Sequence, residues 1–380
     1  MAIDKTMLGQ KLRKCRVNLS FSIEDVAHNT AIPTKRISDI EDGLIEPSGD
    51  EILILSDLFK EDYRYFISNE KLSASEKIEV LYRKHGANFS RNDRIAVQEF
   101  IFLCESEEYI LHSLDTQFRY FSPPKYDIDH IYKSQGRETA NLLRSHLKYQ
   151  DNVAYKDIFS EFRKIGLHIF RRRLENSNIS GMYINHPYAG KCILINYHED
   201  IFRQNFTVAH EVCHSLLDTN FDYNVSFQAD GLDYREIRAN EFASAFLIPE
   251  FLKYQLKETE INEERILQLA IRLKVNIQPL LIALKNYNII AKYQYNKYIN
   301  LKIHKSEKTD YELQNLSDRI LHGKIKLLER GLSDYYVRNC HEAYLKNYIS
   351  VGKLAEMLLV SNEDLVEILQ LFKLKLNNGY

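Results

Sequence analysis

Apolar residues recur every three or four positions through most of the chain, which is the spacing that places them on one face of an α-helix. Within the first 68 residues, polar turn segments at 18–22, 30–33 and 43–49 interrupt this spacing. Four or five short helices fit between these turns. The pattern therefore predicts a compact helical bundle over residues 1–68.

Two further helical patterns follow the bundle, at 73–86 and 91–114. They end before a serine and two prolines at 122–124, residues that do not continue a helix. We therefore expect a helical linker over residues 69–130, followed by a third region with a different pattern.

This third region contains a short stretch with the strand period of two. Residues 161–174 run from a helical into a strand pattern, and 181–185 and 191–196 predict paired strands with 186–190 as their turn. Helical segments are expected at 136–147, 202–218, 234–249, a pair joined at 275–278, and the tail from about 310 to 380. The predicted fold class is therefore α+β, mostly α, with a small sheet.

The composition limits the classes of function. With 51 Lys and Arg against 53 Asp and Glu, the formal net charge is −2, so the protein is not a polycation and any DNA contact must be local. The five cysteines are scattered without a CxxC pair, which favours a reducing cytoplasm and excludes a thiolate zinc site. The sequence lacks a run of 18 uncharged apolar residues, so we expect a cytoplasmic protein without a membrane partner.

The segment HEVCH at 210–214 carries the candidate chemistry. His210 and His214 stand one helical turn apart on the same face, so both rings can bind one Zn²⁺. Glu211 then lies beside the open position of the metal and can take a proton from zinc-bound water. The alternative is a chance motif on a solvated helix, but the apolar flanks predict a buried helix, in which two unpaired histidines would be costly.

A catalytic zinc needs a third protein ligand, and the segment 234–249 offers one. Glu236 and Asn240 share a helix face, whereas Glu241 points about 100° away. We therefore predict Glu236 as the ligand and Asn240 as the hydrogen-bond partner of a ligand histidine. The alternative for Glu236 is a solvated carboxylate between Arg235 and Arg238.

The segments FTVAHEVCHSLLD and EIRANEFASAFLIP together resemble the ImmA/IrrE family of bacterial and phage metallopeptidases, and the resemblance extends over roughly residues 133–290. It implies a gluzincin-like domain over 131–300. The helical pattern of the later chain predicts a helical C-terminal domain over 301–380. It further implies that His210, His214 and Glu236 bind Zn²⁺, with Mn²⁺ as the alternative, and that Glu211 is the base. The stretch FDYNVSFQADGLDY departs from the family pattern and leaves the substrate groove undefined.

Proteins of this family cut Xre-type repressors in response to stress, so the resemblance implies a repressor protein as substrate. Two other functions stay open: a non-catalytic transcription regulator that uses the domain as a sensor, and a component of a toxin–antitoxin system. The intact Glu211 favours the enzyme, because a sensor has no need of the base.

The N-terminal segment SIEDVAHNTAIPTKRISDIEDG resembles an Xre/Cro-type helix-turn-helix. The resemblance implies a recognition helix over 34–41 that contacts operator DNA. The candidate contacts are Thr34, Lys35, Arg36 and Ser38. Residues 1–70 contain 9 Lys and Arg against 13 Asp and Glu, unlike the basic surface of most DNA readers, so docking to a protein is the alternative.

Basic residues outside this helix have two different interpretations. Those of the first helix, Lys11, Arg13, Lys14 and Arg16, are candidates for contacts with the DNA backbone. The run Arg171 to Arg173 on a predicted strand indicates a solvated sheet edge rather than a nucleic-acid site.

Overall fold

The computed structural model describes residues 4–68, 88–126, 131–149, 155–219, 223–227, 233–256 and 260–376. The chain divides into two compact units. The first comprises Met1–Ser106, Leu174–Asn176 and His186–Tyr188, and the second comprises Glu107–Arg173, Ser177–Asn185 and Ala189–Tyr380. The domain boundaries expected from the sequence stay predictions, and the helix predicted at 73–86 lies outside the described residues.

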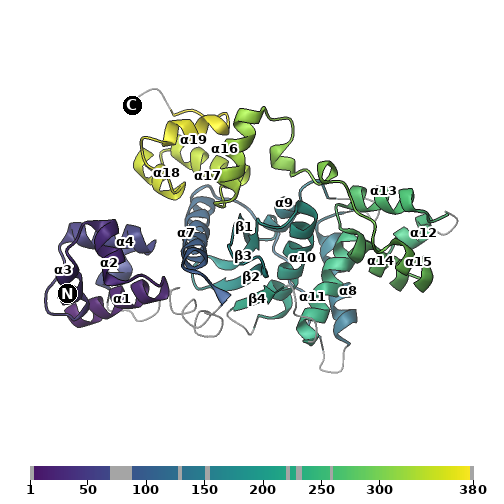
Figure 1. The fold of residues 1–380 in the computed structure, drawn as a ribbon, viewed down its shortest axis with the longest axis horizontal. Coiled ribbons are helices and arrows are strands. Elements are labelled where there is room, and N and C mark those ends of the chain that lie inside the picture. Colours follow the sequence, from purple (N-terminus) through teal and green to yellow (C-terminus); the bar gives the residue numbers. More distant parts are fainter. Residues whose placement is uncertain are drawn as a thin grey trace. The chain divides into compact units, whose positions relative to one another are not determined.

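The first unit opens with the short helices that the sequence predicts. They are α1 (Lys5–Asn18), α2 (Ile23–Thr30), α3 (Thr34–Glu41), α4 (Gly49–Phe59) and α5 (Tyr63–Ile67), coloured purple to blue in Figure 1. Each contributes to one apolar core, represented by Leu12, Val26, Ile37, Leu55 and Phe66. Between α2 and α3 the chain turns through Ala31, which adopts a left-handed conformation with φ of 58°.

The helix predicted at 91–114 is α7 (Arg91–Ser113). Asp93 near its start caps it by accepting from the backbone N–H of Ser90, at 3.1 Å, and also accepts from the N–H of Glu175, at 2.6 Å. No single helix in the part of the chain that the structure describes is long and apolar enough to cross a membrane. The helices α13 (Glu263–Leu273) and α14 (Ile277–Asn286) reach the length and apolar composition of a membrane span only when taken together, and they are bent by 106° relative to each other.

A mixed four-stranded sheet lies in the second unit. Its strands are β1 (His168–Arg172), β2 (Ile179–His186), β3 (Gly190–Asn196) and β4 (Tyr223–Phe227). Their order is β1-β3-β2-β4; β1 runs parallel to β3, and β4 runs antiparallel to β2. The hairpin of β2 and β3 confirms the prediction, whereas β4 at the sheet edge was not predicted.

Helices of the second unit pack around one large apolar core. Those before α13 are α8 (Tyr132–His146), α9 (Ile158–Arg163), α10 (Ile201–Leu217), α11 (Tyr234–Leu247) and α12 (Leu252–Leu256). α10 packs on β3 and on α11, and α11 packs on α8 (Figure 1). The mostly helical structure with its small mixed sheet confirms the α+β class. Because both faces of α10 are covered, a polar side chain on it must find a buried partner.

The chain continues beyond α14 through α15 (Lys292–Tyr298) into a helical C-terminal region. Its elements are η2 (Lys305–Glu307), η3 (Tyr311–Leu313), α16 (Asp318–Leu328), α17 (Asp334–Leu345), α18 (Val351–Met357) and α19 (Leu365–Leu371). α18 packs on α17 and α19 packs on α16, so the segment 351–369 is a packing element within this region.

The C-terminal region is attached to β1 through the arginine run, and the prediction of a solvated edge is wrong for two of its three residues. Arg171 is 3% exposed and pairs with Asp310 and with Glu312, the latter at 2.9 Å. Arg172 is also buried and donates to the carbonyl oxygen of Arg330. A buried guanidinium needs such partners, so these contacts fix the strand to the later chain.

Candidate metal centre

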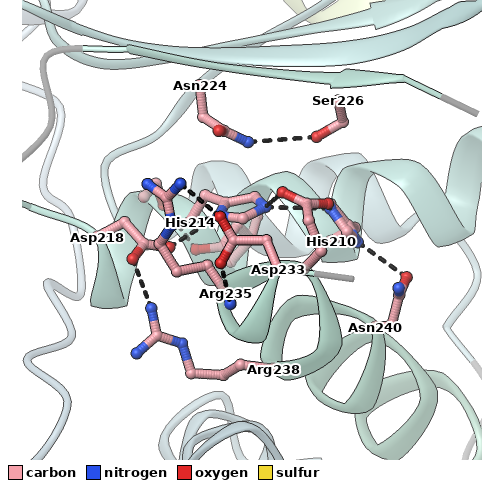
Figure 2. Close-up of polar contacts among 12 residues, drawn as sticks. His210, His214, Asp218, Asn224, Ser226, Asp233, Arg235, Arg238 and Asn240 are labelled. Atoms are coloured by element: carbon pink, nitrogen blue, oxygen red, sulfur yellow. Dashed lines mark hydrogen bonds and ion pairs between the residues drawn. The ribbon is translucent and has the colours of Figure 1, made fainter. Parts of the chain in front are cut away.

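Two helices bring the three predicted ligands together. His210 and His214 lie on α10, and Glu236 lies on the first turn of α11. Nε2 of His210 is 3.1 Å from Nε2 of His214 and 3.0 Å from Oε2 of Glu236, and Nε2 of His214 is 3.2 Å from Oε1 of Glu236 (Figure 2). All three residues are buried, and their ligand atoms lie within 4.8 Å of one another. The predicted trio is therefore one compact cluster.

The outer nitrogens of both rings face hydrogen-bond acceptors. Nδ1 of His214 is 2.7 Å from Oδ2 of Asp218, and Nδ1 of His210 is 3.1 Å from Oδ1 of Asn240. Each Nδ1 must therefore carry the hydrogen, which leaves a lone pair on each Nε2 when the rings are neutral. Two nitrogen lone pairs and a carboxylate then face one another, and a cation between them satisfies all three. The residues present thus fit a divalent metal with nitrogen and oxygen ligands.

The pKa values of His214 and Glu236 also indicate that the cluster favours a positive charge. Burial opposes ionisation of His214, but hydrogen bonds to Asp218 and Glu236 outweigh it and raise its pKa to about 9. Burial likewise opposes ionisation of Glu236, yet the two histidines hold the pKa of this carboxyl well below its usual range. The cluster therefore favours positive charge between the rings and the carboxylate.

Asp218 is a functional candidate that the sequence reasoning missed. It follows His214 by four residues, directly after the last residue of α10, and this spacing was the available signal. Its second oxygen accepts from Nη2 of Arg238 at 2.5 Å (Figure 2). Nη1 of Arg238 in turn donates to Oε1 of Gln135 on α8 at 3.1 Å. This buried chain of contacts orients the ring of His214 from two neighbouring helices.

The alternatives for the third ligand do not fit the structure. Glu236 is 8% exposed, and its neighbour Arg235 pairs with Asp233 while Arg238 pairs with Asp218, so Glu236 is not a solvated carboxylate. Glu241 instead accepts from Arg137 on α8 at 2.6 Å. Glu236, and not Glu241, therefore lies with the two histidines, as the helix-face argument expects.

Glu211, the predicted base, is fully buried beside the cluster. Neither carboxylate oxygen makes a hydrogen bond of good geometry to a described residue. Burial raises the pKa of Glu211, against the opposing influence of His210, His214 and the hydroxyl of Ser226. A buried carboxyl with a raised pKa beside a cluster of histidines is a candidate functional residue.

The strands β2 and β4 lie next to Glu211. Gly181 on β2 is paired in register with Ser226 on β4, and a Cβ atom on Gly181 would lie 3.1 Å from Oε1 of Glu211. Asn224 and Ser226 lie on β4, across from the histidines in Figure 2, with Nδ2 of Asn224 3.3 Å from Oγ of Ser226. The strand β4 thus supplies polar groups to the site from the stretch whose pattern the sequence left undefined.

The residues predicted to contact DNA lie on α3 in the first unit, and they differ in how far their side chains are exposed to solvent. Thr34 and Lys35 are exposed, and Ser38 is half-buried. Arg36 is bound to Glu51 of α4 through both Nε and Nη2, the latter at 2.8 Å, which lowers the pKa of Glu51 to about 2. Arg36 therefore serves the bundle itself, and Thr34 and Lys35 stay the accessible candidates.

Three basic residues of α1, namely Lys11, Arg13 and Arg16, also make contacts within the bundle. Lys11 is buried and donates to the carbonyl oxygens of Tyr65 and Ser68. Arg16 pairs with Glu41 at 2.6 Å, and Arg13 pairs with Glu41 at 3.2 Å. For Lys11 and Arg16, which are largely covered, the expectation of DNA-backbone contacts is wrong, because their charges are satisfied inside the domain.

No curated protein matches the chain. A family model does match, over residues 162–285, a span that contains β1 to β4, both cluster helices and all three ligand candidates. These residues, roughly a third of the chain, match the peptidase M78 family model described as the IrrE N-terminal-like domain, which supports an ImmA/IrrE-type metallopeptidase-like domain in this part of the protein.

Proposed function

We propose that the protein is a zinc-dependent endopeptidase that cleaves a repressor-type regulatory protein. The observation that carries this proposal is the buried cluster of His210, His214 and Glu236, with the carboxyl of Glu211 next to it. Two buried histidines and a carboxylate at these distances offer nitrogen and oxygen ligands to one divalent metal, and the carboxyl of Glu211 lies beside them in the position of a base.

In this proposal the two rings and the carboxylate hold the metal, and Asp218 and Asn240 keep the rings in the tautomer that exposes Nε2. Zn²⁺ at this position would polarise a water molecule and a peptide carbonyl. Glu211 takes the proton of the attacking water and delivers it to the leaving amine nitrogen. Burial raises the pKa of Glu211 above its usual range, which strengthens this carboxylate as a base.

The proposed substrate is an Xre-type repressor in the cytoplasm, in a stress response or in a phage or mobile element. The support is the match to the IrrE-type domain model together with the ImmA/IrrE resemblance of the motif segments. Mn²⁺ is the alternative metal, because the same nitrogen and oxygen donors accept it.

A second candidate is a non-catalytic transcription regulator, including a role in a toxin–antitoxin pair. The exposed Thr34 and Lys35 on α3, in a bundle that resembles an Xre-type helix-turn-helix, favour this candidate. Under this proposal the bundle binds operator DNA and the metal cluster serves as a sensor.

Metal analysis together with a cleavage assay separates the two candidates. We expect one Zn²⁺ per chain in wild type and in Glu211→Gln, since Glu211 is not a ligand. Cleavage of the repressor encoded beside this gene should fall in Glu211→Gln by about 10²–10⁴. Equal cleavage by both proteins would contradict the role of Glu211 as the base, whereas no cleavage by either protein with the metal bound would favour the regulator.

A further inference from the structure

A cavity of about 580 Å³ lies in the second unit, away from the metal cluster. Its walls are the start of α10, the start of α14 and the segment 299–308 that follows α15. Asp200 at its edge precedes His210 by ten residues, which is about 15 Å along a helix. This volume is within the range of small-molecule sites, about 300–1,000 Å³.

One wall of the cavity is cationic. Lys302, Lys305 and Lys308 line it, against a single carboxylate, Asp200. Lys308 is held in place, because its Nζ donates to Oδ1 of Asn276 at 2.6 Å and pairs with Asp200 at 3.0 Å. Lys302 and Lys305 are exposed and make no ion pair with any residue that the structure describes. Two positive charges are therefore left over at this wall.

The start of α14 adds donors to the same place. Asn276 is the N-cap residue, but its side chain accepts from Lys308 and makes no capping hydrogen bond to the helix. Pro279, at the third helical position, has no N–H of its own. The N–H groups of Ile277 and Gln278, both of which line the cavity, are thus without a side-chain cap. Uncapped N–H groups at a helix start favour an anion.

The segment 299–308 also supplies apolar lining residues, Ile299, Leu301 and Ile303, and Ile277 of α14 adds a fourth. A ligand that contacts both kinds of lining residue has an anionic group and an apolar body. A carboxylate brings one negative charge, whereas a phosphate monoester brings about 1.5 to 2 negative charges and three acceptor oxygens at neutral pH. The two unpaired lysines and the uncapped helix match the larger charge.

We propose that this cavity binds a small organic phosphate, with the phosphate group near Lys302, Lys305 and the start of α14 and the apolar body against the apolar lining residues Ile299, Leu301 and Ile303. The site is separate from the metal cluster and does not depend on the proposed peptidase activity. Because Lys308 also binds Asp200, the residue that caps α10, an occupant would contact the helix that carries both histidines.

Isothermal titration calorimetry of the full-length protein tests the proposal with three probes: 1-naphthyl phosphate, inorganic phosphate and 1-naphthoate. We expect 1-naphthyl phosphate to bind at least tenfold more tightly than either of the others, because only it carries both a phosphate group and an apolar body. The double variant Lys302→Ala/Lys305→Ala should weaken its binding at least tenfold. The matched control Lys292→Ala/Lys297→Ala removes two lysines of α15 that do not line the cavity and should bind as wild type does.

Three outcomes would overturn the proposal: no binding of 1-naphthyl phosphate at millimolar concentration, equal affinity for 1-naphthoate, or equal weakening by the two double variants. Circular dichroism of each variant verifies the fold. Glu211→Gln should bind 1-naphthyl phosphate as wild type does, so failure of this proposal and failure of the peptidase proposal are distinguishable.

Discussion

Gly181 on β2 lies against the carboxylate of Glu211, with no room for a side chain between them. A Cβ atom at this position would lie 3.1 Å from both Cγ and Oε1 of Glu211 and 2.9 Å from Cγ2 of Thr207. Glycine is thus required here for close approach, and the carboxylate of the proposed base is positioned by the strand above it.

We predict that Gly181→Ala displaces the carboxylate of Glu211 and lowers cleavage of the repressor at least tenfold, while metal content stays at the wild-type level. The reason is that the atoms nearest to the new methyl group belong to Thr207 and Glu211 and not to a proposed ligand. Gly352→Ala is the control, because its added Cβ would meet no atom closer than 4.0 Å. Loss of metal in Gly181→Ala would show instead that the whole site had shifted.

A second prediction concerns Asp218. Asp218→Asn removes the charge that orients His214 through Nδ1, and we expect the affinity for Zn²⁺ to fall by about 10–100-fold. Competition with a chelating dye measures this affinity. Asp233→Asn is the matched control, since Asp233 caps α11 from the surface and touches no ligand. An unchanged affinity in Asp218→Asn would contradict the role given to this contact.

The sequence predicted the elements that carry the site, because each of them has a strong local signal. The stripe of apolar residues around HEVCH fixes α10 as a buried helix, and the spacing from Glu236 to Asn240 fixes which face of α11 meets it. The proposed ligands His210, His214 and Glu236 and the partner of His210 follow from these two helices. Helical periodicity was therefore enough to predict that these residues form one candidate site.

Two features that the sequence did not predict, the strand β4 and the burial of Arg171, depend on contacts between residues far apart in the sequence. The strand β4 has only five residues, and although apolar and polar residues alternate along them, so short an alternation does not stand out from the polar stretch around it. Arg171 is buried because Asp310 and Glu312 cover it, and both lie about 140 positions later in the chain. A sequence alone does not show which acidic residues return to a given strand, so a buried arginine looks like a solvated one.

A third prediction uses the pH dependence of a buried pair. Nδ1 of His168 on β1 is 2.7 Å from Oε2 of Glu107, and Nε2 is 3.1 Å from Glu108. Burial opposes protonation of His168, but the two glutamates outweigh it and raise its pKa to about 10, above the usual value of about 6.5. This pair therefore stabilises the fold fully below pH 6.5, and its contribution is lost as the pH rises toward 10.

We expect the urea midpoint of wild type to fall between pH 7 and pH 10, and the double variant His168→Gln/Glu107→Gln to show a flatter dependence over the same range. Both groups are replaced together because Glu107 alone would be left as a buried charge without its partner. His322→Gln, on the exposed side of α16, should keep the wild-type slope. Parallel curves for wild type and the double variant would contradict the assignment.

The last prediction separates DNA binding from protein docking by the N-terminal bundle, using two adjacent basic residues of α3. Lys35 is exposed, whereas Arg36 is bound to Glu51. If the target is operator DNA, Lys35→Ala should weaken binding and lower the salt dependence by about one unit, as loss of one phosphate contact does. Arg36→Ala should also lower the unfolding midpoint, because Glu51 loses its partner. Lys60→Ala, at the end of α4, is the control for charge alone.

A mobility-shift assay of the full chain on the DNA upstream of its gene, titrated with salt, measures the binding. If DNA affinity is negligible while Lys35→Ala reduces repressor cleavage, the bundle docks a protein; if neither changes, α3 is not the recognition helix.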